Sequence, residues 1–375
     1  MREILFVAGE ASGDSHGALV ARELVSRGAP FALVGVGGDQ MRAAGVELIA
    51  HTGQLAVMGF VEVLETIPRH IGLLRKIKQR LRGGHVAAVV LIDYPDFNMF
   101  VAAAAKAAGV PVLYYITPQV WAWRAGRLDT LARTISRAAV ILPFEEKLLR
   151  SRGIDATFVG HPLIDRVGQL PERDDARAAL GVSRDDRVLA LFPGSRRQEI
   201  EHHLDAFVAV ARALQRRIPA LKVIVAVAPH VTLDAARCPF PMVRSASFTV
   251  FRAADAAFCK SGTTTLEAAV AGCPLVVAYR MNRVNYAVAR AFVKIDNIGL
   301  VNLIAERRLV PEFVQDALQP AAVADALEPL LDHASAARRA MVEGLRAVRA
   351  SLGEPGAAGR VASMVLELAG QGPHG

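Results

Sequence analysis

Residues 261–267, SGTTTLE, combine hydroxyl, glycine and carboxylate groups at a spacing that could bind a pyrophosphate. They follow a short apolar run and begin an expected helix, which Gly272 ends and Pro274 cannot continue. Such a turn directs free backbone N–H groups and the positive helix end toward one point, which suits an anion. The hydroxyls could cap the helix or donate to phosphate oxygens, and Glu267 could reach a ribose. An ordinary capped turn between strand and helix would use the same residues.

A second turn of this type, PGSR at 193–196, follows an expected strand at residues 187–192. Ser195 would expose its backbone N–H at the start of a long helix, where anions bind well. Arg196 adds a planar guanidinium that matches the shape of a phosphate. The pattern predicts a second anion site, with a plain surface turn as the alternative.

Carboxylates also follow an almost wholly apolar strand expected at residues 86–92. Asp93, Asp96 and Asn98 lie just beyond it, and two carboxylates with an amide at a strand end could form a general-base cluster. Asp96 could instead cap the next helix. Asp93 precedes the turn and has less reason to be a cap.

The loop after the first expected strand, residues 9–14, also carries polar groups. Open α/β sheets place ligands at such loops, but the spacing is not G-x-G-x-x-G, so a dinucleotide fold is not supported. Glu10 and Asp14 could line a site or cap the following helix.

Both tryptophans of the chain, Trp121 and Trp123, follow another expected strand at residues 110–116. Two large rings in a loop favour the wall of a binding site, although a place in the core would also satisfy them.

The pattern of residues 66–82 predicts a helix that begins near Thr66 and Pro68. Its apolar residues recur at intervals of three and four and are Ile67, Ile71, Leu74, Ile77 and Leu81. Its basic residues are Arg69, Arg75, Lys76, Lys78, Arg80 and Arg82. The helix could pack its apolar stripe on a sheet, or it could lie at an anionic lipid surface. The second interpretation makes Ile71, Leu74, Arg75 and Lys78 membrane-facing.

Composition limits the remaining choices. The chain has 375 residues, of which 53% are hydrophobic and 21% charged, so a globular protein of two domains is expected. Three scattered cysteines argue against a zinc site or a disulfide framework, and no apolar run of about 18 residues is present. The net charge of +8 favours an anionic metabolite or membrane. Nucleic acid ranks last because the basic residues are dispersed and aromatics are few.

Strands and helices alternate in two successive halves, which predicts two doubly wound Rossmann-like α/β domains facing across a cleft. We expect a first domain at residues 1–165 and a second domain at residues 166–350. The terminal helix at residues 351–375 could pack back on the first domain.

Nine segments together resemble the lipid-A-disaccharide synthase family, whose members are inverting glycosyltransferases of the GT-B fold. In chain order they are GEASGD at 9–14, MGFVEVL at 58–64, IDYPDFN at 92–98, PQVWAWR at 118–124, LPFE at 142–145, FVGHP at 158–162, PGSR at 193–196, SGTTTLE at 261–267 and CPLVVAYRM at 273–281. The resemblance runs from about residue 3 to residue 320, and the combination is specific although each motif alone is weak.

The resemblance implies transfer of sugar from UDP-2,3-diacylglucosamine to 2,3-diacylglucosamine 1-phosphate, giving an acylated disaccharide phosphate and UDP. It implies no cofactor and no bound metal. It also implies a peripheral enzyme on the cytoplasmic face of the inner membrane of a Gram-negative bacterium, with a homodimer as one option. Another GT-B transferase or epimerase acting on a UDP-N-acetylglucosamine-type donor, or a non-catalytic anionic-lipid binding protein, are the alternatives.

The resemblance also assigns residues. Asp93 matches the general base, and Glu10 is the second catalytic candidate. The donor-binding residues implied are Ser195, Arg196, Ser261, Gly262, Thr263, Glu267 and Asn302. The acceptor-side residues are Ser12, Asp14, Asn98, Trp121 and Trp123. Val301 stands where the family usually has a proline before the asparagine.

Overall fold

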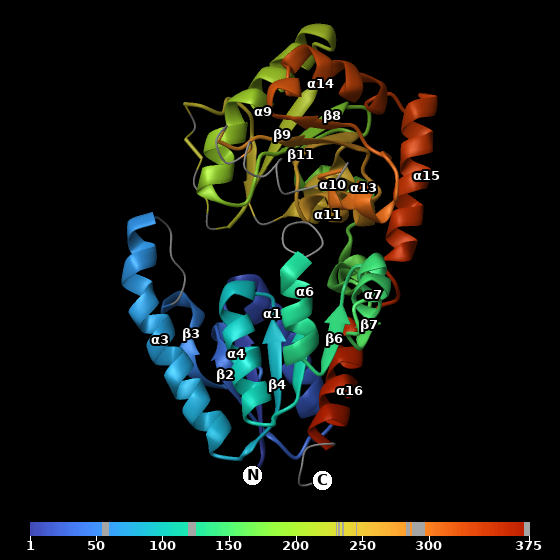
Figure 1. The fold of residues 1–375 in the computed structure, drawn as a ribbon. Coiled ribbons are helices and arrows are strands. Elements are labelled where there is room, and N and C mark those ends of the chain that lie inside the picture. Colours follow the sequence, from blue (N-terminus) through green and yellow to red (C-terminus); the bar gives the residue numbers. More distant parts are fainter. Residues whose placement is uncertain are drawn as a thin grey trace. The chain divides into compact units, whose positions relative to one another are not determined.

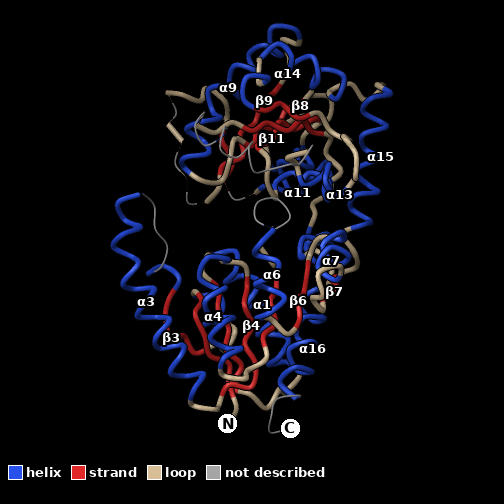
Figure 2. The backbone as a smooth tube through the Cα atoms, viewed as in Figure 1, coloured by secondary structure: helices blue, strands red, loops and turns tan. Residues whose placement is uncertain are grey.

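The computed structural model describes residues 1–54, 60–118, 125–229, 231, 233–234, 236–244, 246–282, 286 and 297–370. It forms two compact units, one of Met1–Pro162 with Glu354–Gly375 and one of Leu163–Gly353. Each unit is built on one parallel sheet covered by helices (Figures 1 and 2). Trp121 and Trp123 lie outside the described residues.

The first sheet has seven parallel strands in the order β3-β2-β1-β4-β5-β6-β7. Their bounds are β1 Glu3–Ala8, β2 Ala32–Gly37, β3 Glu47–His51, β4 Val86–Ile92, β5 Val112–Tyr115, β6 Arg137–Val140 and β7 Ala156–Phe158. The chain reverses its direction of strand addition between β1 and β4. Ligands of open α/β sheets bind beyond the carboxyl ends of strands at such a switch point. The loops after β1 and β4 are therefore the natural site of this unit.

Helices cover both faces of this sheet (Figure 1). Their bounds are α1 Ala11–Ser26, α2 Asp39–Ala43, α3 Phe60–Arg82, α4 Pro95–Ala107, α6 Ala125–Thr134, α7 Pro143–Arg150 and α16 Ala357–Gly370. Apolar residues of α3, α4 and α6 form one core with the sheet, and those of α1 and α16 form the other. The terminal helix α16 thus packs on the first unit, where Arg27 of α1 donates to Ser363 at 2.8 Å.

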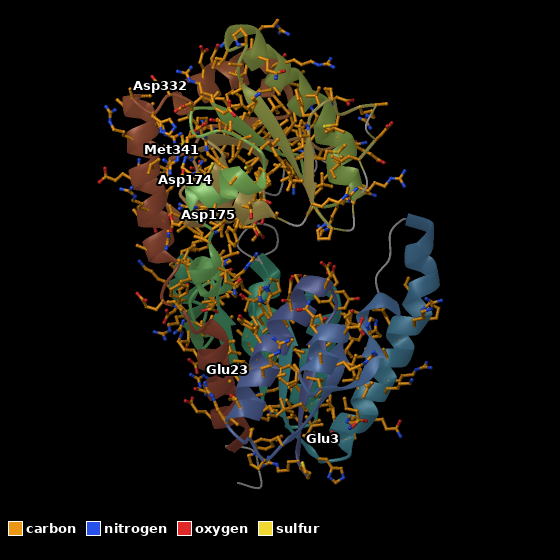
Figure 3. The ribbon with its side chains drawn as sticks, turned by 180° about the vertical axis from the view of Figure 1, so that it is seen from behind. Glu3, Glu23, Asp174, Asp175, Asp332 and Met341 are labelled. Atoms are coloured by element: carbon orange, nitrogen blue, oxygen red, sulfur yellow. The ribbon has the colours of Figure 1, made fainter. Side chains whose placement is uncertain are left out.

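Helix α3 differs from its predicted packing. The expected apolar face included Ile67 and Ile71, yet these are 47% and 46% exposed. Ile77 and Leu81 of the expected face do enter the core, together with Leu73, which was not expected there. The described core contacts thus come from the later turns of α3, where Arg80 also pairs with Glu3 at 2.7 Å (Glu3 labelled in Figure 3).

The second sheet has six parallel strands in the order β10-β9-β8-β11-β12-β13. Their bounds are β8 Val188–Phe192, β9 Lys222–Val227, β10 Met242–Arg244, β11 Ala256–Lys260, β12 Leu275–Tyr279 and β13 Glu312–Val314. The helices are α8 Arg173–Ala179, α9 Arg197–Arg217, α10 Ser247–Ala253, α11 Thr264–Ala271, α13 Leu300–Ile304, α14 Pro320–Leu327 and α15 Ala336–Ser351. The switch point lies between β8 and β11. The predicted class, two doubly wound α/β units with terminal helices, is confirmed.

A buried ionic cluster lies at the amino ends of the central strands of this sheet. Asp255, only 1% exposed, accepts from Arg173, from Arg177 at 3.0 Å and from His333 at 2.7 Å. Its carboxylate also accepts the N–H of Val188, the first residue of β8, at 2.7 Å. The cluster therefore joins α8 and the segment before α15 to the starts of two central strands. Nearby, the Met341 sulfur of α15 accepts the N–H of Leu275 at 3.4 Å (Met341 labelled in Figure 3).

Candidate active site

The turn after β4 holds Asp93 in an unusual backbone conformation. Asp93 and Tyr94 have φ values of 47° and 51°, so two consecutive residues that are not glycine are left-handed. Each such residue costs about 1–3 kcal/mol and persists only where its surroundings enforce it. The carbonyl of Asp93 accepts the Tyr114 hydroxyl at 2.8 Å and the Asn98 amide at 2.7 Å. These bonds fix the peptide from which the half-buried Asp93 side chain projects.

The Asn98 side chain contacts the backbone of the Asp93 turn, not the Asp93 carboxylate. It is fully buried, and its amide nitrogen also lies 3.3 Å from the Val7 carbonyl and 3.4 Å from the Ile92 carbonyl. The side chain therefore lies beneath the ends of β1 and β4, where it supports the turn of Asp93.

Tyr94 joins the loops of three elements. Its ring packs directly on Gly9, where an added Cβ would come within 2.1 Å of the ring. Its hydroxyl lies 2.5 Å from Nε2 of His70 on α3. Burial, with the nearby charges of Glu10 and Asp96, raises the pKa of Tyr94, so the phenol stays protonated. The β1 loop, the β4 turn and α3 are thus tied together beside Asp93.

Asp14 is buried and fully engaged by backbone groups. Its carboxylate accepts from Gly38 at 2.6 Å, Gln40 at 3.1 Å and Met41 at 3.0 Å. It therefore caps the start of α2, a different helix from the one the sequence suggested. Ser12 is exposed, and Glu10 precedes α1 as an exposed N-cap residue whose side chain makes no capping bond.

The other proposed cap in this unit also differs from expectation. Helix α4 begins at Pro95, with Tyr94 as its N-cap residue. Asp96 lies inside the first turn, where its charge suits the positive helix end. It does not occupy the N-cap position.

Two histidines lie near the same strand ends. The His16 ring makes an edge contact with Tyr115, with centroids 6.1 Å apart. Burial and the neighbouring His16 lower the pKa of His161 to about 4, and burial also lowers the pKa of His16. Both imidazoles are therefore neutral at pH 7.

In the second unit, the turn between β11 and α11 has the expected form. Helix α11 begins at Thr264 and ends before Gly272, whose φ is 71°. The first N–H groups of a helix have no carbonyl within it and point outward. The Ser261 hydroxyl donates to the Ile298 carbonyl at 2.8 Å, and Thr263 is the N-cap residue without a side-chain capping bond. Gly262 has a φ of 149°, which lets the backbone turn there.

Glu267 faces a cluster that the sequence did not indicate. Its carboxylate lies 3.6 Å from the Arg166 guanidinium, which stacks over the Phe248 ring at 4.5 Å. Burial raises the pKa of Glu267, although Arg166 and the Ser247 hydroxyl oppose the rise. The Glu267 side chain is 18% exposed, so one edge can reach a ligand.

The PGSR turn is occupied by a carboxylate of the protein itself. Glu199 accepts the N–H of Ser195 at 2.9 Å and that of Arg196 at 3.3 Å. It also pairs with Lys260 at 2.8 Å. Burial alone would raise the pKa of Glu199, but Lys260 and the N–H groups outweigh burial and lower it. Glu199 is the third residue of α9 and reaches back to the backbone at the helix start, as in a capping box, so these two N–H groups have a partner within the chain.

His203 links this turn to the end of β12. Its Nδ1 lies 2.6 Å from the Glu199 carbonyl, and its Nε2 accepts the N–H of Arg280 at 2.8 Å. Nδ1 must therefore carry the proton. Burial lowers the pKa of His203 to about 4, so this neutral form persists at pH 7.

Asn302 supports the loop that contacts the turn before α11. It is fully buried, donates to the Val310 carbonyl and to Glu312, and accepts the Val310 N–H. Glu312 also accepts the N–H groups of Ile298 and Gly299. Asn302 thus holds the loop whose Ile298 carbonyl binds Ser261. Val301 is buried without disturbing this arrangement.

Comparisons with known proteins decide the family. The family model "Lipid-A-disaccharide synthetase" matches residues 4–355. The chain belongs to the lipid-A-disaccharide synthase family. It is therefore a glycosyltransferase of lipid A biosynthesis. The lipid-A-disaccharide synthase of Geobacter metallireducens is 39% identical, covering 99% of this chain and 98% of that protein. The one from Anaeromyxobacter dehalogenans is 43% identical, with 97% of each chain covered.

Solved structures agree on the fold. The calicheamicin glycosyltransferase CalG4 has a TM-score of 0.60 at 20% identity, covering 99% of both chains. The UDP-GlcNAc 2-epimerase of Neisseria meningitidis has a TM-score of 0.66 at 12% identity, covering 97% of this chain and 100% of that one. This chain therefore has the GT-B fold, as the resemblance implied.

Several residues of the two sites escaped the sequence-based analysis. They contact residues in or beside the motifs but lie outside the motifs themselves, and they are His70, Tyr114, Arg166, Lys260 and His203. Four of them are distant along the chain from the motif residues that they contact, whereas Lys260 directly precedes the motif at 261–267. Polar residues facing the carboxyl ends of apolar strands were the usable signal, and Lys260 at the end of β11 fits it.

Proposed function

We propose that this enzyme transfers 2,3-diacylglucosamine from its UDP derivative to 2,3-diacylglucosamine 1-phosphate with inversion, releasing UDP. Inversion by a single displacement needs one base for the acceptor hydroxyl and a stabilised leaving group. The observation that carries the proposal is the fixed left-handed turn of Asp93 at a switch point of the first sheet. Backbone strain of this kind is found most often at functional sites.

Asp93 takes the proton of the acceptor hydroxyl in this proposal. A base must be held rigidly to act, and the bonds from Tyr114 and Asn98 to the Asp93 carbonyl supply that rigidity. Exposed Glu10 and Ser12 line the acceptor side, while Asp14 shapes the adjoining loop. Trp121 and Trp123 are assigned to the acceptor side from the sequence.

The donor nucleotide binds the second unit. Glu267 holds the ribose hydroxyls, and the turn at Ser261, Gly262 and Thr263 with the positive end of α11 holds the diphosphate. Ser195 and Arg196 approach the phosphates from the other turn. The partly exposed Glu267 and the outward N–H groups of the α11 start support this assignment.

Two variants test the proposal. Asp93→Asn should reduce disaccharide formation by about 10²-fold or more, since general-base catalysis contributes about 10²–10⁴-fold. Asp96→Asn, which neutralises a carboxylate one turn away, is the matched control and should retain most activity. If Asp93→Asn turns over at a rate close to that of the unaltered enzyme, Asp93 is not the general base.

We also propose that α3 docks on the anionic inner-membrane surface. Ile67 and Ile71 are half exposed, and Arg75 and Lys78 are exposed beside them. Apolar and basic side chains on one helix favour an interfacial position. Leu74 packs partly against the core, so it contributes less than the sequence suggested. No helix in the described part of the chain is long and apolar enough to cross a membrane.

Ile71→Ser should lower binding to vesicles containing anionic phospholipid by about fivefold, because roughly 1 kcal/mol of apolar burial is lost. Val25→Ser, at an exposed valine of α1, is the control and should bind as the unaltered protein does. Equal vesicle binding by both variants would contradict the docking of α3. A homodimer, which the family resemblance suggested, is tested by light scattering on the same samples.

A further inference from the structure

Lys260 lies beside both anion-binding turns of the second unit. It is the last residue of β11, and its Nζ is 2.8 Å from Oε1 of Glu199. A methyl group built on Gly262 would lie 3.8 Å from the same Nζ. Since Oε2 of Glu199 accepts the Ser195 N–H, one ammonium group adjoins the turn at 193–196 and the turn at 261–263.

The surroundings of Lys260 hold its ammonium group in place and leave N–H donors for a further hydrogen-bond partner. The Lys260 and Glu199 side chains are 17% and 18% exposed, and Nζ lies 5.6 Å from the centroid of the Tyr279 ring. An ammonium has three N–H donors. Glu199 is its one hydrogen-bond partner in the part of the chain that the structure describes. The remaining donors are available to an anion bound at the turn at 261–263.

A cation beside the diphosphate would favour the reaction. As the bond between the anomeric carbon and the β-phosphate oxygen breaks, the electron pair stays on that oxygen. The acceptor oxygen bonds to the same carbon and its proton passes to the base. Groups that bind the developing charge in a partly buried site stabilise the transition state strongly.

We infer that Lys260 is a further donor-binding residue that contacts the diphosphate of the UDP-sugar, and that Glu199 positions its ammonium group. The inference rests on the proposed function, because it assumes a UDP donor on this unit. Lys260 was not among the residues that the motifs indicated, and its assignment comes from the geometry around its Nζ.

A purely structural role is the competing explanation. Lys260 would then only neutralise Glu199, and its loss would weaken UDP binding by leaving a bare carboxylate near the phosphates. The two explanations differ when both charges are removed together. Removing Glu199 as well would restore UDP binding if Lys260 only neutralises it, and would not if Lys260 contacts the phosphates.

The test measures binding of UDP and of uridine by calorimetry to the full chain and to three variants. Lys260→Met should weaken UDP binding about tenfold or more and leave uridine binding within about twofold, because uridine has no phosphate. Lys260→Arg, which retains the charge, should keep UDP binding within about threefold. Lys260→Met combined with Glu199→Gln should remain as weak for UDP as the single variant. Thermal unfolding of each variant establishes that it is folded.

Three results would overturn the inference: unchanged UDP binding in Lys260→Met, equal losses for UDP and uridine, or recovery in the double variant. These leave the proposed function standing, since the unaltered protein still binds UDP. Failure of the unaltered protein to bind UDP would overturn the donor assignment itself, and the inference with it.

Discussion

Replacement of Tyr114 by phenylalanine tests whether the Asp93 turn is held for catalysis. The change removes one hydroxyl, which donates to the Asp93 carbonyl at 2.8 Å, and leaves the buried ring in place. Asn98 still donates to that carbonyl, so no buried acceptor is left unpaired. One net hydrogen bond is worth about 1 kcal/mol. That energy lowers the population of the left-handed turn relative to relaxed conformations by about fivefold.

We therefore expect kcat of Tyr114→Phe to fall, by about fivefold at most, because the loss is smaller the more the turn predominates in the unaltered enzyme. KM for the UDP-sugar stays unchanged because the donor residues belong to the other unit. The midpoint of thermal unfolding should fall by a few degrees. Tyr115→Phe is the control: it deletes the same group on the same strand, but its ring lies in the opposite core. Steady-state kinetics on both variants is the assay. A lower unfolding midpoint with unchanged kcat in Tyr114→Phe would refute the reasoning.

Two further predictions concern stability. Asp255→Asn should lower the free energy of unfolding by about 3–5 kcal/mol in urea titrations, because it leaves the 2% exposed Arg177 without its buried counter-charge; a loss below 1 kcal/mol would show that solvent reaches the cluster. The pKa of His161 in the folded state is lowered to about 4. Between pH 6.5 and pH 4 the unfolded chain therefore binds more protons than the folded chain. The free energy of unfolding falls as the pH drops through that window, by about 3 kcal/mol for this group. His161→Gln should flatten that part of the profile measured by thermal unfolding, and an unchanged slope would contradict the assignment.

The sequence predicted the central strands well because each is a continuous apolar run. The expected range 86–92 coincides with β4, and the first expected strand, which precedes the loop at 9–14, is β1. Strands β3, β10 and β13 were missed, since they are short or half-exposed edge strands without an apolar run. The faces of α3 were assigned from periodicity alone. Periodicity left two interpretations of the apolar stripe open, packing on the sheet or lying at a membrane. In the structure Ile77 and Leu81 pack in the core, whereas Ile67 and Ile71 are exposed.

The candidate site was predictable as far as local turns allow. The turn at 261–267, the end of β4 and the loop after β1 all follow apolar strands and were identified from that position. What the polar groups bind was not predictable, because their partners come from distant segments. Asp14 caps α2 across 24 residues, and Lys260 reaches Glu199 across 61 residues. Such pairs depend on strand order, which no local pattern encodes.

Incubation of the purified chain with UDP-2,3-diacylglucosamine and 2,3-diacylglucosamine 1-phosphate tests the central claim most directly. UDP and the acylated disaccharide phosphate are followed together, with Asp93→Asn beside the unaltered enzyme. We predict that the two products form in equal amounts with inverted anomeric configuration, and that Asp93→Asn forms neither at a comparable rate. Release of UDP without disaccharide, or recovery of a sugar epimer in its place, would contradict the account.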